Sequence, residues 1–180
     1  MTSAEDSLSL REIITDYADF PKQGILFRDI NPVFRRYDAL NFISNEFQQR
    51  FSNTKIDIIA GIESRGFVIA TLLATRFRTG MIMIRKAGKL PGSTLRKSYE
   101  IEYGDATMEV QCDAIKKGQN ILVADDLIAT GGTSIASSRL IEELGARVAG
   151  FAFVIELLNL NGSNRLRKMG YDVQSLVRYS

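Results

Sequence analysis

The segment that most constrains the fold of this chain is residues 121–133, which read ILVADDLIATGGT. It opens with an unbroken apolar run, Ile121 to Ala124, as expected of a parallel strand that is buried on both faces. Two adjacent carboxylates follow, and then a turn of small and hydroxyl residues. After Thr133, apolar residues recur at helical spacing as far as Gly145, a residue that suits a helix C-terminus. The segment therefore predicts a strand, a loop and a helix of a parallel α/β fold.

The loop between this strand and this helix predicts an anion site. Its small residues leave backbone N–H groups accessible, and the helix N-terminus adds a partial positive charge. We call it the glycine loop, and its residues are Ala129, Thr130, Gly131, Gly132 and Thr133. The preceding Asp125 and Asp126 repel phosphate, so we expect them to accept hydrogen bonds from sugar hydroxyls or to help hold a metal-bound ligand. A ribose phosphate satisfies both halves of the motif, whereas the simpler alternative is a polar turn without a ligand.

Composition excludes several other classes of protein. The chain has 180 residues, the size of one domain, and a net charge of +2, so no broad basic surface indicates nucleic-acid binding. Histidine is absent and Cys112 is the sole cysteine, which excludes an intrachain disulfide, a Cys/His zinc site and a Ser-His or Cys-His catalytic pair. A general acid or base must therefore be another side chain, the substrate or water. The sequence has no membrane-length apolar run and no signal peptide, so we expect a cytoplasmic protein without membrane partners.

The order of the predicted elements indicates the fold class. Helical patterns at about residues 5–17, 38–51, 66–77 and 133–144 alternate with apolar strands near residues 56–62, 81–85, 120–125, 147–155 and 172–177. This alternation predicts an α/β fold with a Rossmann-like central parallel β-sheet flanked by helices. We also expect an antiparallel pair, residues 96–101 and 107–112, joined through Tyr103, Gly104 and Asp105 and projecting from the body as a flap. In such folds, ligands bind beyond the carboxyl ends of the parallel strands.

Two further segments place cations after predicted strands. Residues 63–66, ESRG, follow an apolar run and precede a helix, so a second strand-to-helix junction exposes N–H groups beside a permanent positive charge. Residues 85–92, RKAGKLPG, form an irregular segment that we call the basic loop, and its cations are Arg85, Lys86 and Lys89. Both segments suit an anion, although charges at such positions are often merely solvated.

Together these segments resemble the type I phosphoribosyltransferase family, and within it the members that act on adenine. Residues 121–133 resemble the family's phosphoribosyl pyrophosphate motif, and residues 19–30, DFPKQGILFRDI, its base-binding segment. Residues 61–67, GIESRGF, resemble the pyrophosphate loop. The basic loop and residues 98–104, SYEIEYG, resemble the flexible catalytic loop. The resemblance runs from about residue 10 to the C-terminus, in the same order and near the same spacing.

The resemblance implies an activity and a domain organisation. The reaction is transfer of the 5-phosphoribosyl group from phosphoribosyl pyrophosphate to adenine, giving AMP and pyrophosphate in purine salvage. The implied cofactor is Mg²⁺, held mainly by substrate and water and not directly by protein ligands. A homodimer is implied, with neither nucleic acid nor membrane as a partner. Residues 1–180 would form a single phosphoribosyltransferase domain, with residues 1–34 as a base-binding hood and residues 86–111 as a flexible catalytic loop or flap.

The resemblance also implies the site residues. The glycine loop would bind the 5-phosphate, and Asp125 with Asp126 the ribose hydroxyls. The implied pyrophosphate-binding residues are Ser64, Arg65, Arg85, Lys86 and Lys89, with Arg85 reaching a neighbouring subunit. The implied catalytic residues are Glu102, Tyr103, Arg65 and Lys89. The implied base-binding residues are Leu26, Phe27, Arg28 and Leu157, and a non-proline cis peptide is expected at Glu63–Ser64.

Specific roles follow for some of these residues. Because histidine is absent, Glu102 is the candidate acid or base for the purine imidazole, and Tyr103 would cover the reacting ribose. A backbone C=O of Leu26 and N–H of Arg28 would pair with N6 and N1 of adenine and reject hypoxanthine, whose donor and acceptor are reversed. Leu157 would supply an apolar face for the purine.

Two alternative functions stay open at this point. The first is a 6-oxopurine phosphoribosyltransferase, although such enzymes typically carry an acid in the phosphate loop, where this chain has Ala129. The second is a non-catalytic regulator that senses phosphoribosyl pyrophosphate. Such regulators usually append a DNA-binding domain, for which 180 residues leave no room. The glycines and cations of the loops are present in this chain, which favours an enzyme over a regulator.

Overall fold

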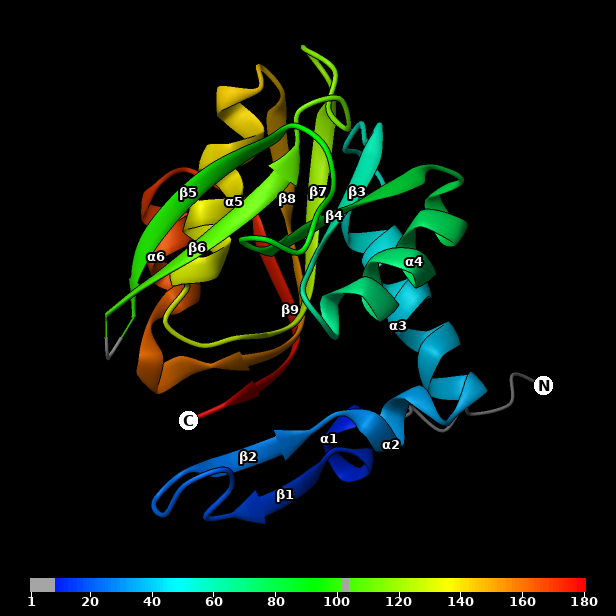
Figure 1. Ribbon diagram of the computed structural model, residues 1–180. Coiled ribbons are helices and arrows are strands. Elements are labelled where there is room, and N and C mark those ends of the chain that lie inside the picture. Colours follow the sequence, from blue (N-terminus) through cyan, green and yellow to red (C-terminus); the bar gives the residue numbers. More distant parts are fainter. Residues whose placement is uncertain (1–8, 102–103) are drawn as a thin grey trace, which may run out of the picture.

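Residues 9–101 and 104–180 are described by the structure, a computed structural model of the chain. It confirms the predicted α/β class, with a main sheet of seven strands in the order β5-β6-β4-β3-β7-β8-β9 (Figure 1). The parallel part of this sheet is made of β4 (Gly80–Lys86), β3 (Ile58–Ile62), β7 (Asn120–Ile128), β8 (Arg147–Leu157) and β9 (Val173–Tyr179). A separate two-stranded sheet pairs β1 (Thr15–Ala18) with β2 (Leu26–Asp29).

Helices cover both faces of the main sheet. Helices α3 (Tyr37–Arg50) and α4 (Gly66–Phe77) contribute buried apolar side chains to the core on one face. Helices α5 (Gly132–Glu143) and α6 (Gly162–Lys168) do so on the other face. Because β7 lies between the two cores, its residues Ile121–Ala124 are all fully buried, as the apolar run predicted.

Strand β7 is longer than the sequence predicted, because its two neighbours end at different levels. It pairs with β3 only up to Ala124, but with β8 as far as Ile128. Asp125 and Asp126 therefore lie inside the strand, which corrects the expectation that the strand ends at about residue 125. They stand where β3 has stopped and β8 continues, at the carboxyl end of the parallel sheet.

The alternation of side chains along β7 shifts by one residue at these carboxylates. Ala124 and Leu127 both contact the core beneath α3 and α4, whereas Ile128 contacts the core beneath α5 and α6. Strict alternation would instead place residues 124, 126 and 128 on one face. The shift is consistent with the positions of Asp125 and Asp126, which both reach the beginning of α4 although they are adjacent.

The N-terminal segment differs from the helix predicted over residues 5–17. Within its described part, only α1 (Leu10–Ile13) is helical, and β1 follows almost directly. The strand forms because β2 supplies an antiparallel partner, with Asp16 opposite Arg28 in the register and in an ion pair with it. Such a partner is a tertiary contact that sequence periodicity does not report. In Figure 1 this small sheet lies below the main sheet, near the C-terminus.

The predicted antiparallel hairpin is confirmed as β5 (Thr94–Ile101) and β6 (Gly104–Gln111), with two corrections. The register pairs Ile101 with Gly104, so Gly104 and Asp105 belong to β6 and not to the turn. The hairpin also does not project freely from the body. Strand β6 pairs with β4 at its base, and both hairpin strands contact α5, as Figure 1 shows.

Three short helical segments were not predicted: α2 (Asn31–Phe34), the 3-10 helix η1 (Leu158–Leu160) and α6. Each is too short to display a helical apolar period, and in α6 the buried apolar side chain is Leu166. None of the described helices has the length and apolar character required to cross a membrane.

Candidate active site

The glycine loop joins β7 to α5 and lines a cavity of about 120 Å³. The cavity wall also includes Asp125, Leu127, Ile128 and Ser134. Gly131 is the N-cap of α5 and has a φ of 81°, a conformation that other residues rarely adopt. The first N–H groups of a helix have no intrahelical partner and carry partial positive charge. The cavity therefore has the donors of an anion site, at the position predicted from the sequence.

Helix α6, which the sequence did not predict, braces the glycine loop from outside the cavity. The N–H of Gly162 donates to the C=O of Ala129 at 3.0 Å, and the guanidinium of Arg165 donates to the C=O of Thr130 at 2.8 Å. A Cβ at Gly162 would lie 2.2 Å from the Ala129 oxygen, so a larger residue there would displace the loop. These contacts fix the backbone of the loop without a ligand.

Asp126 and Arg65 form an ion pair between β7 and α4. The Nε of Arg65 donates to Oδ2 of Asp126, which is only 6% exposed. Arg65 is the N-cap of α4, and its side chain is 40% exposed. The structure thus brings together a predicted ribose-binding carboxylate and a predicted pyrophosphate-binding cation that are 61 residues apart in the sequence.

Asp125 has different surroundings. Its Oδ1 accepts a hydrogen bond from the N–H of Asp126 at 2.9 Å. A Cβ at Gly66 would come within 2.7 Å of that oxygen, so the close approach of α4 to the carboxylate requires glycine. Burial, and then the charge of Asp126, raises the pKa of the Asp125 carboxyl well above its ordinary value. The two aspartates are therefore not equivalent, because one is paired with a cation and the other is disfavoured as an anion.

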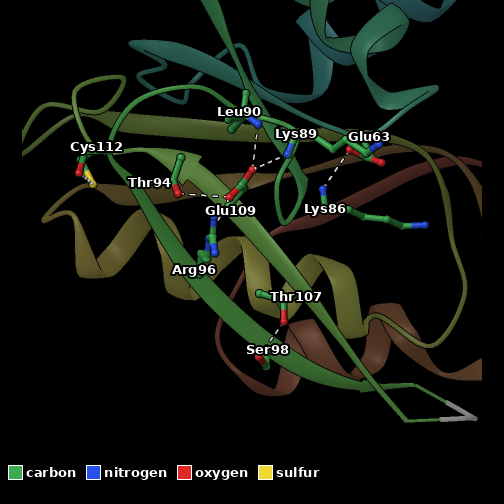
Figure 2. Close-up of polar contacts among 11 residues, drawn as sticks. Glu63, Lys86, Lys89, Leu90, Thr94, Arg96, Ser98, Thr107, Glu109 and Cys112 are labelled. Carbon is green, nitrogen blue, oxygen red and sulfur yellow. Dashed lines mark hydrogen bonds and ion pairs between the residues drawn. The ribbon is translucent and has the colours of Figure 1, made fainter.

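Glu63 ties the end of β3 to the end of β4. Its Oε2 accepts a hydrogen bond from the Nε of Arg85 at 3.1 Å. The same oxygen accepts from the N–H of Lys86 at 2.9 Å, a contact that Figure 2 shows. The peptide bond between Glu63 and Ser64 is cis, as predicted. The side chains of Lys86 and Lys89 are exposed, and among the described residues neither ammonium has an ion-pair partner. Of the cations in the basic loop, Arg85 is already paired, and the two lysines remain available to an anion.

The predicted base-binding strand β2 meets the main domain at Phe27. The guanidinium carbon of Arg65 lies 5.5 Å from the centre of the Phe27 ring, and the rings of Phe20 and Phe27 pack in a T-shaped arrangement with 5.1 Å between their centres. Leu26 is 50% exposed. One arginine therefore contacts both a predicted ribose-binding aspartate and a predicted base-binding aromatic residue.

A second contact links β2 to the end of the main sheet. The guanidinium carbon of Arg28 lies 4.0 Å from the centre of the Tyr179 ring. Tyr179 is the register partner of Leu157 in the parallel ladder of β8 and β9. The predicted base-binding residues of β2 and β8 are thus joined through Tyr179, which the sequence did not identify because a lone terminal tyrosine belongs to no motif.

Tyr99 of β5 connects the hairpin to the glycine loop. The hydroxyl of Thr133 donates to the hydroxyl of Tyr99 at 3.0 Å. Tyr99 lies in a block that the sequence associated with the catalytic loop, but no role was assigned to it. Glu102 and Tyr103, the predicted acid/base and ribose cover, lie outside the described residues. Within the described residues, no three His, Cys, Asp or Glu side chains form a cluster that could hold a metal ion.

Comparisons with known proteins agree in sequence and in structure. Residues 35–177 match the family of the phosphoribosyl transferase domain. The adenine phosphoribosyltransferase of Nitrosopumilus maritimus is 54% identical over 172 residues, which cover 96% of this chain and 100% of the relative. The adenine phosphoribosyltransferase of Cenarchaeum symbiosum is 45% identical with the same coverage of both chains.

Solved structures extend this agreement to the fold. The crystal structure of adenine phosphoribosyltransferase from Thermoanaerobacter pseudethanolicus has a TM-score of 0.90 and 42% identity, covering 95% of this chain and 100% of that one. The enzyme from Saccharomyces cerevisiae has a TM-score of 0.86 and 39% identity, covering 93% and 96%. The matches span nearly the whole of both partners. The chain belongs to the phosphoribosyl transferase family and, within it, to the adenine phosphoribosyltransferases.

Proposed function

We propose that this chain transfers the 5-phosphoribosyl group of phosphoribosyl pyrophosphate to N9 of adenine, releasing AMP and pyrophosphate for purine salvage. The observation that carries the proposal is the glycine-loop cavity, whose wall includes Asp125, beside the Asp126–Arg65 pair, with Phe27 against the same arginine. The relative from Saccharomyces cerevisiae was solved with adenine. The relative from Trypanosoma brucei, 26% identical, was solved with AMP, pyrophosphate and ribose-5-phosphate.

The 5-phosphate is assigned to the glycine loop. A phosphate there would accept hydrogen bonds from the N–H groups at the beginning of α5 and from the hydroxyls of Thr130 and Thr133. The bracing contacts of Gly162 and Arg165 support this assignment, because a loop that is already ordered loses less entropy on binding.

The ribose hydroxyls are assigned to Asp125 and Asp126. In the reaction of the family, positive charge develops on the ribose ring as the bond to pyrophosphate breaks, so nearby carboxylates favour the transition state. Arg65 now neutralises Asp126, and its side chain is the more exposed of the two. We propose that Arg65 turns toward the leaving pyrophosphate when substrate binds, which leaves Asp126 to the sugar.

The pyrophosphate is assigned to Ser64, Arg65, Lys86 and Lys89. The exposed lysine ammonium groups support this assignment, because a departing pyrophosphate accumulates negative charge and cations that close around it lower the barrier. Arg85 is paired with Glu63, so we do not assign it to the pyrophosphate of its own chain. We propose that it contributes to the site of a neighbouring subunit, and that residues 86–111 act as the catalytic flap.

The adenine base is assigned to the hood, residues 1–34, and to Leu157. Strand β2 belongs to a two-stranded sheet, so one of its edges has backbone groups free for a ligand. Leu26 and Arg28 are two residues apart, so their backbone groups face the same edge and can offer the C=O and N–H that N6 and N1 of adenine require. Phe27 and Leu157 would cover the faces of the purine.

Proton transfer is assigned to Glu102, with Tyr103 covering the reacting ribose. Attack by N9 of adenine on the ribose carbon leaves one excess proton on the imidazole ring. Because the chain has no histidine, a carboxylate is the natural acceptor for that proton.

The cofactor is proposed to be Mg²⁺. Among the described residues no three acidic, histidine or cysteine side chains gather in a cluster for a metal ion, and Arg65 already engages Asp126, so substrate oxygens and water would form the shell of the ion. When bound, the ion would neutralise charge on the pyrophosphate.

Assembly and location are proposed on separate grounds. Met83 is an apolar side chain that is 43% exposed and lies two residues from Arg85 on β4, so we assign the homodimer interface to this part of β4. A single cysteine offers no intrachain disulfide, as is typical of cytoplasmic proteins. Light scattering coupled to gel filtration measures the assembly directly.

An assay with phosphoribosyl pyrophosphate and each of adenine, hypoxanthine and guanine tests the proposed reaction. We expect AMP from adenine and no product from the two 6-oxopurines, because they reverse the hydrogen-bond pattern. Turnover of hypoxanthine would support the 6-oxopurine alternative. Binding of phosphoribosyl pyrophosphate without turnover of any base would support the regulator.

A further inference from the structure

Glu109 is a buried carboxylate that the proposed reaction does not use. It lies on β6, opposite Arg85 of β4 in the antiparallel ladder, and is 0% exposed. A carboxylate is seldom buried unless donors replace the water that it loses. The partners of Glu109 therefore indicate its task.

Four donors surround this carboxylate, two on each oxygen (Figure 2). The backbone N–H groups of Lys89 and Leu90 donate to Oε1 at 2.8 and 2.9 Å. The hydroxyl of Thr94 and the Nε of Arg96 donate to Oε2 at 3.2 and 3.0 Å. One side chain on β6 thus fastens the basic loop and the beginning of β5 at the same point.

The donors also keep Glu109 ionised. Burial by itself would raise the pKa of Glu109, but the hydrogen bonds from the N–H groups of Leu90 and Lys89 and from the Thr94 hydroxyl outweigh it and lower the pKa to about 2. An ionised carboxylate is an acceptor only, so it holds donors on both oxygens throughout the neutral range.

The basic loop requires such an anchor because its own sequence does little to restrict the conformation of its backbone. Gly88 and Gly92 have φ angles of 82° and 78°, and Pro91 between them has no N–H to donate. Most of the residues from Lys86 to Gly92 are exposed. Without fixed points, a loop of this composition samples many conformations.

We infer that Glu109 is a positioning residue for the leaving pyrophosphate, because it fixes the backbone that carries Lys89. The inference rests on the proposed function, which assigns pyrophosphate to this lysine. Glu109 itself does not bind pyrophosphate, since its oxygens are occupied by donors and its charge repels the ligand. Cations on an ordered loop lose less entropy when they close around an anion, and they act on the transition state without reorganisation.

Two substitutions of Glu109 test the inference. In Glu109→Gln, the side-chain oxygen still accepts from Lys89 and Leu90, but the new NH₂ faces the Nε of Arg96, which is also a donor. Glu109→Ala removes the acceptor for every one of these groups.

The matched control is Asp57→Asn. The Asp57 carboxylate accepts hydrogen bonds from the N–H and side chain of Asn120 at 2.8 and 3.0 Å, where β3 and β7 begin, at the opposite end of the sheet from the site. The control therefore makes the same chemical change to a carboxylate that holds a backbone N–H, away from the basic loop.

For Glu109→Gln we expect the KM for phosphoribosyl pyrophosphate to rise about tenfold, because misplaced cations lose both binding and orientation. The Kd of magnesium pyrophosphate, measured by calorimetry, should rise by the same factor. The KM for adenine should stay within about twofold, and Glu109→Ala should exceed Glu109→Gln in each effect. In Asp57→Asn, both KM values should stay within about twofold even if the melting temperature falls.

Amide hydrogen exchange gives a readout that does not depend on turnover. Peptides covering residues 86–93 should exchange faster in Glu109→Gln than in the wild type, while peptides from β7 and α5 should not change. Unchanged exchange in residues 86–93, or wild-type affinity of the variant for magnesium pyrophosphate, overturns the inference. Failure of the wild type to convert adenine would instead overturn the proposed function, and the pyrophosphate titration would still decide the role of Glu109.

Discussion

The guanidinium of Arg65 donates to the carboxylate of Asp126 and thereby joins the beginning of α4 to the carboxyl end of β7. The side chain of the aspartate is 8% exposed, whereas that of the arginine is 40% exposed. The arginine is therefore the partner that is able to move when a ligand arrives, and the aspartate is the fixed member of the pair.

Substituting Asp126→Asn should lower kcat/KM for phosphoribosyl pyrophosphate about a hundredfold, because the site loses a negative charge beside the ribose. Initial rates at varied substrate concentration measure the effect. The control is Asp38→Asn, which removes an exposed ion pair with Arg36 at the beginning of α3, outside the residues assigned to the site, and should change kcat/KM less than about twofold. Equal activity of Asp126→Asn and wild type would contradict the assignment of this carboxylate.

Substituting Gly162→Ala should raise the KM for phosphoribosyl pyrophosphate and lower the melting temperature. The new methyl group would lie 2.2 Å from the Ala129 oxygen and 2.8 Å from the Gly131 nitrogen, so the glycine loop must shift. We expect destabilisation of about 1–3 kcal/mol, as for overpacking in general. Gly80→Ala is the control, because a Cβ there meets nothing within 4 Å. A Gly162→Ala protein with wild-type KM would show that the loop does not need this brace.

Substituting Tyr99→Phe should have a small effect on catalysis. It removes the hydrogen bond to the Thr133 hydroxyl, and a neutral hydrogen bond of this kind contributes about 1 kcal/mol. We expect a change of about fivefold in the KM for phosphoribosyl pyrophosphate, with the KM for adenine unaffected. Tyr37→Phe, at a side chain that is 82% exposed, serves as the comparison. A loss of several hundredfold in kcat would mean that Tyr99 takes part in the chemistry directly.

Because of Glu109, the free energy of unfolding should depend on pH in the acid range. Its pKa is about 2 in the folded protein and has an ordinary value of 4.5, so the folded state binds fewer protons between these two values. Its stabilising contribution is therefore fully present above about pH 4.5 and is lost as the pH falls toward about 2. Urea unfolding of wild type and Glu109→Gln should show a difference in the free energy of unfolding that is largest near neutral pH and shrinks on acidification. A difference that grows below about pH 4 would have the wrong sign.

The central strands and their loops were the most predictable part of the fold. The run Ile121–Ala124 identified β7 because only a strand between two helical layers tolerates apolar residues on both faces. Gly145, with a φ of 83°, ends α5 as its position in the sequence indicated. The glycine loop follows from the same local signals, so the position of the loop between β7 and α5 could be predicted with its residues.

The parts that the sequence did not reveal depend on distant contacts. Strand β1 exists because β2 pairs with it, and α6 is held where Gly162 and Arg165 bond to the glycine loop. In the sequence, Glu109 is one polar residue of a strand in which polar and apolar residues alternate. Only the fold shows that four donors converge on it. Local periodicity carries no information about such partners.

The strand assigned to the base, β2, belongs to a two-stranded sheet of its own, whereas the glycine loop and Asp126 are part of the main sheet. The backbone groups that we assign to the edge of the purine thus lie in a small appendage, whose backbone ladder is independent of the one that positions the sugar phosphate, and of the assigned base-binding residues Leu157 alone belongs to the main sheet. Base preference in this architecture is open to redesign by grafting residues 15–29 from a relative, with the donor chosen for its nucleobase and the rest of the enzyme left as it stands.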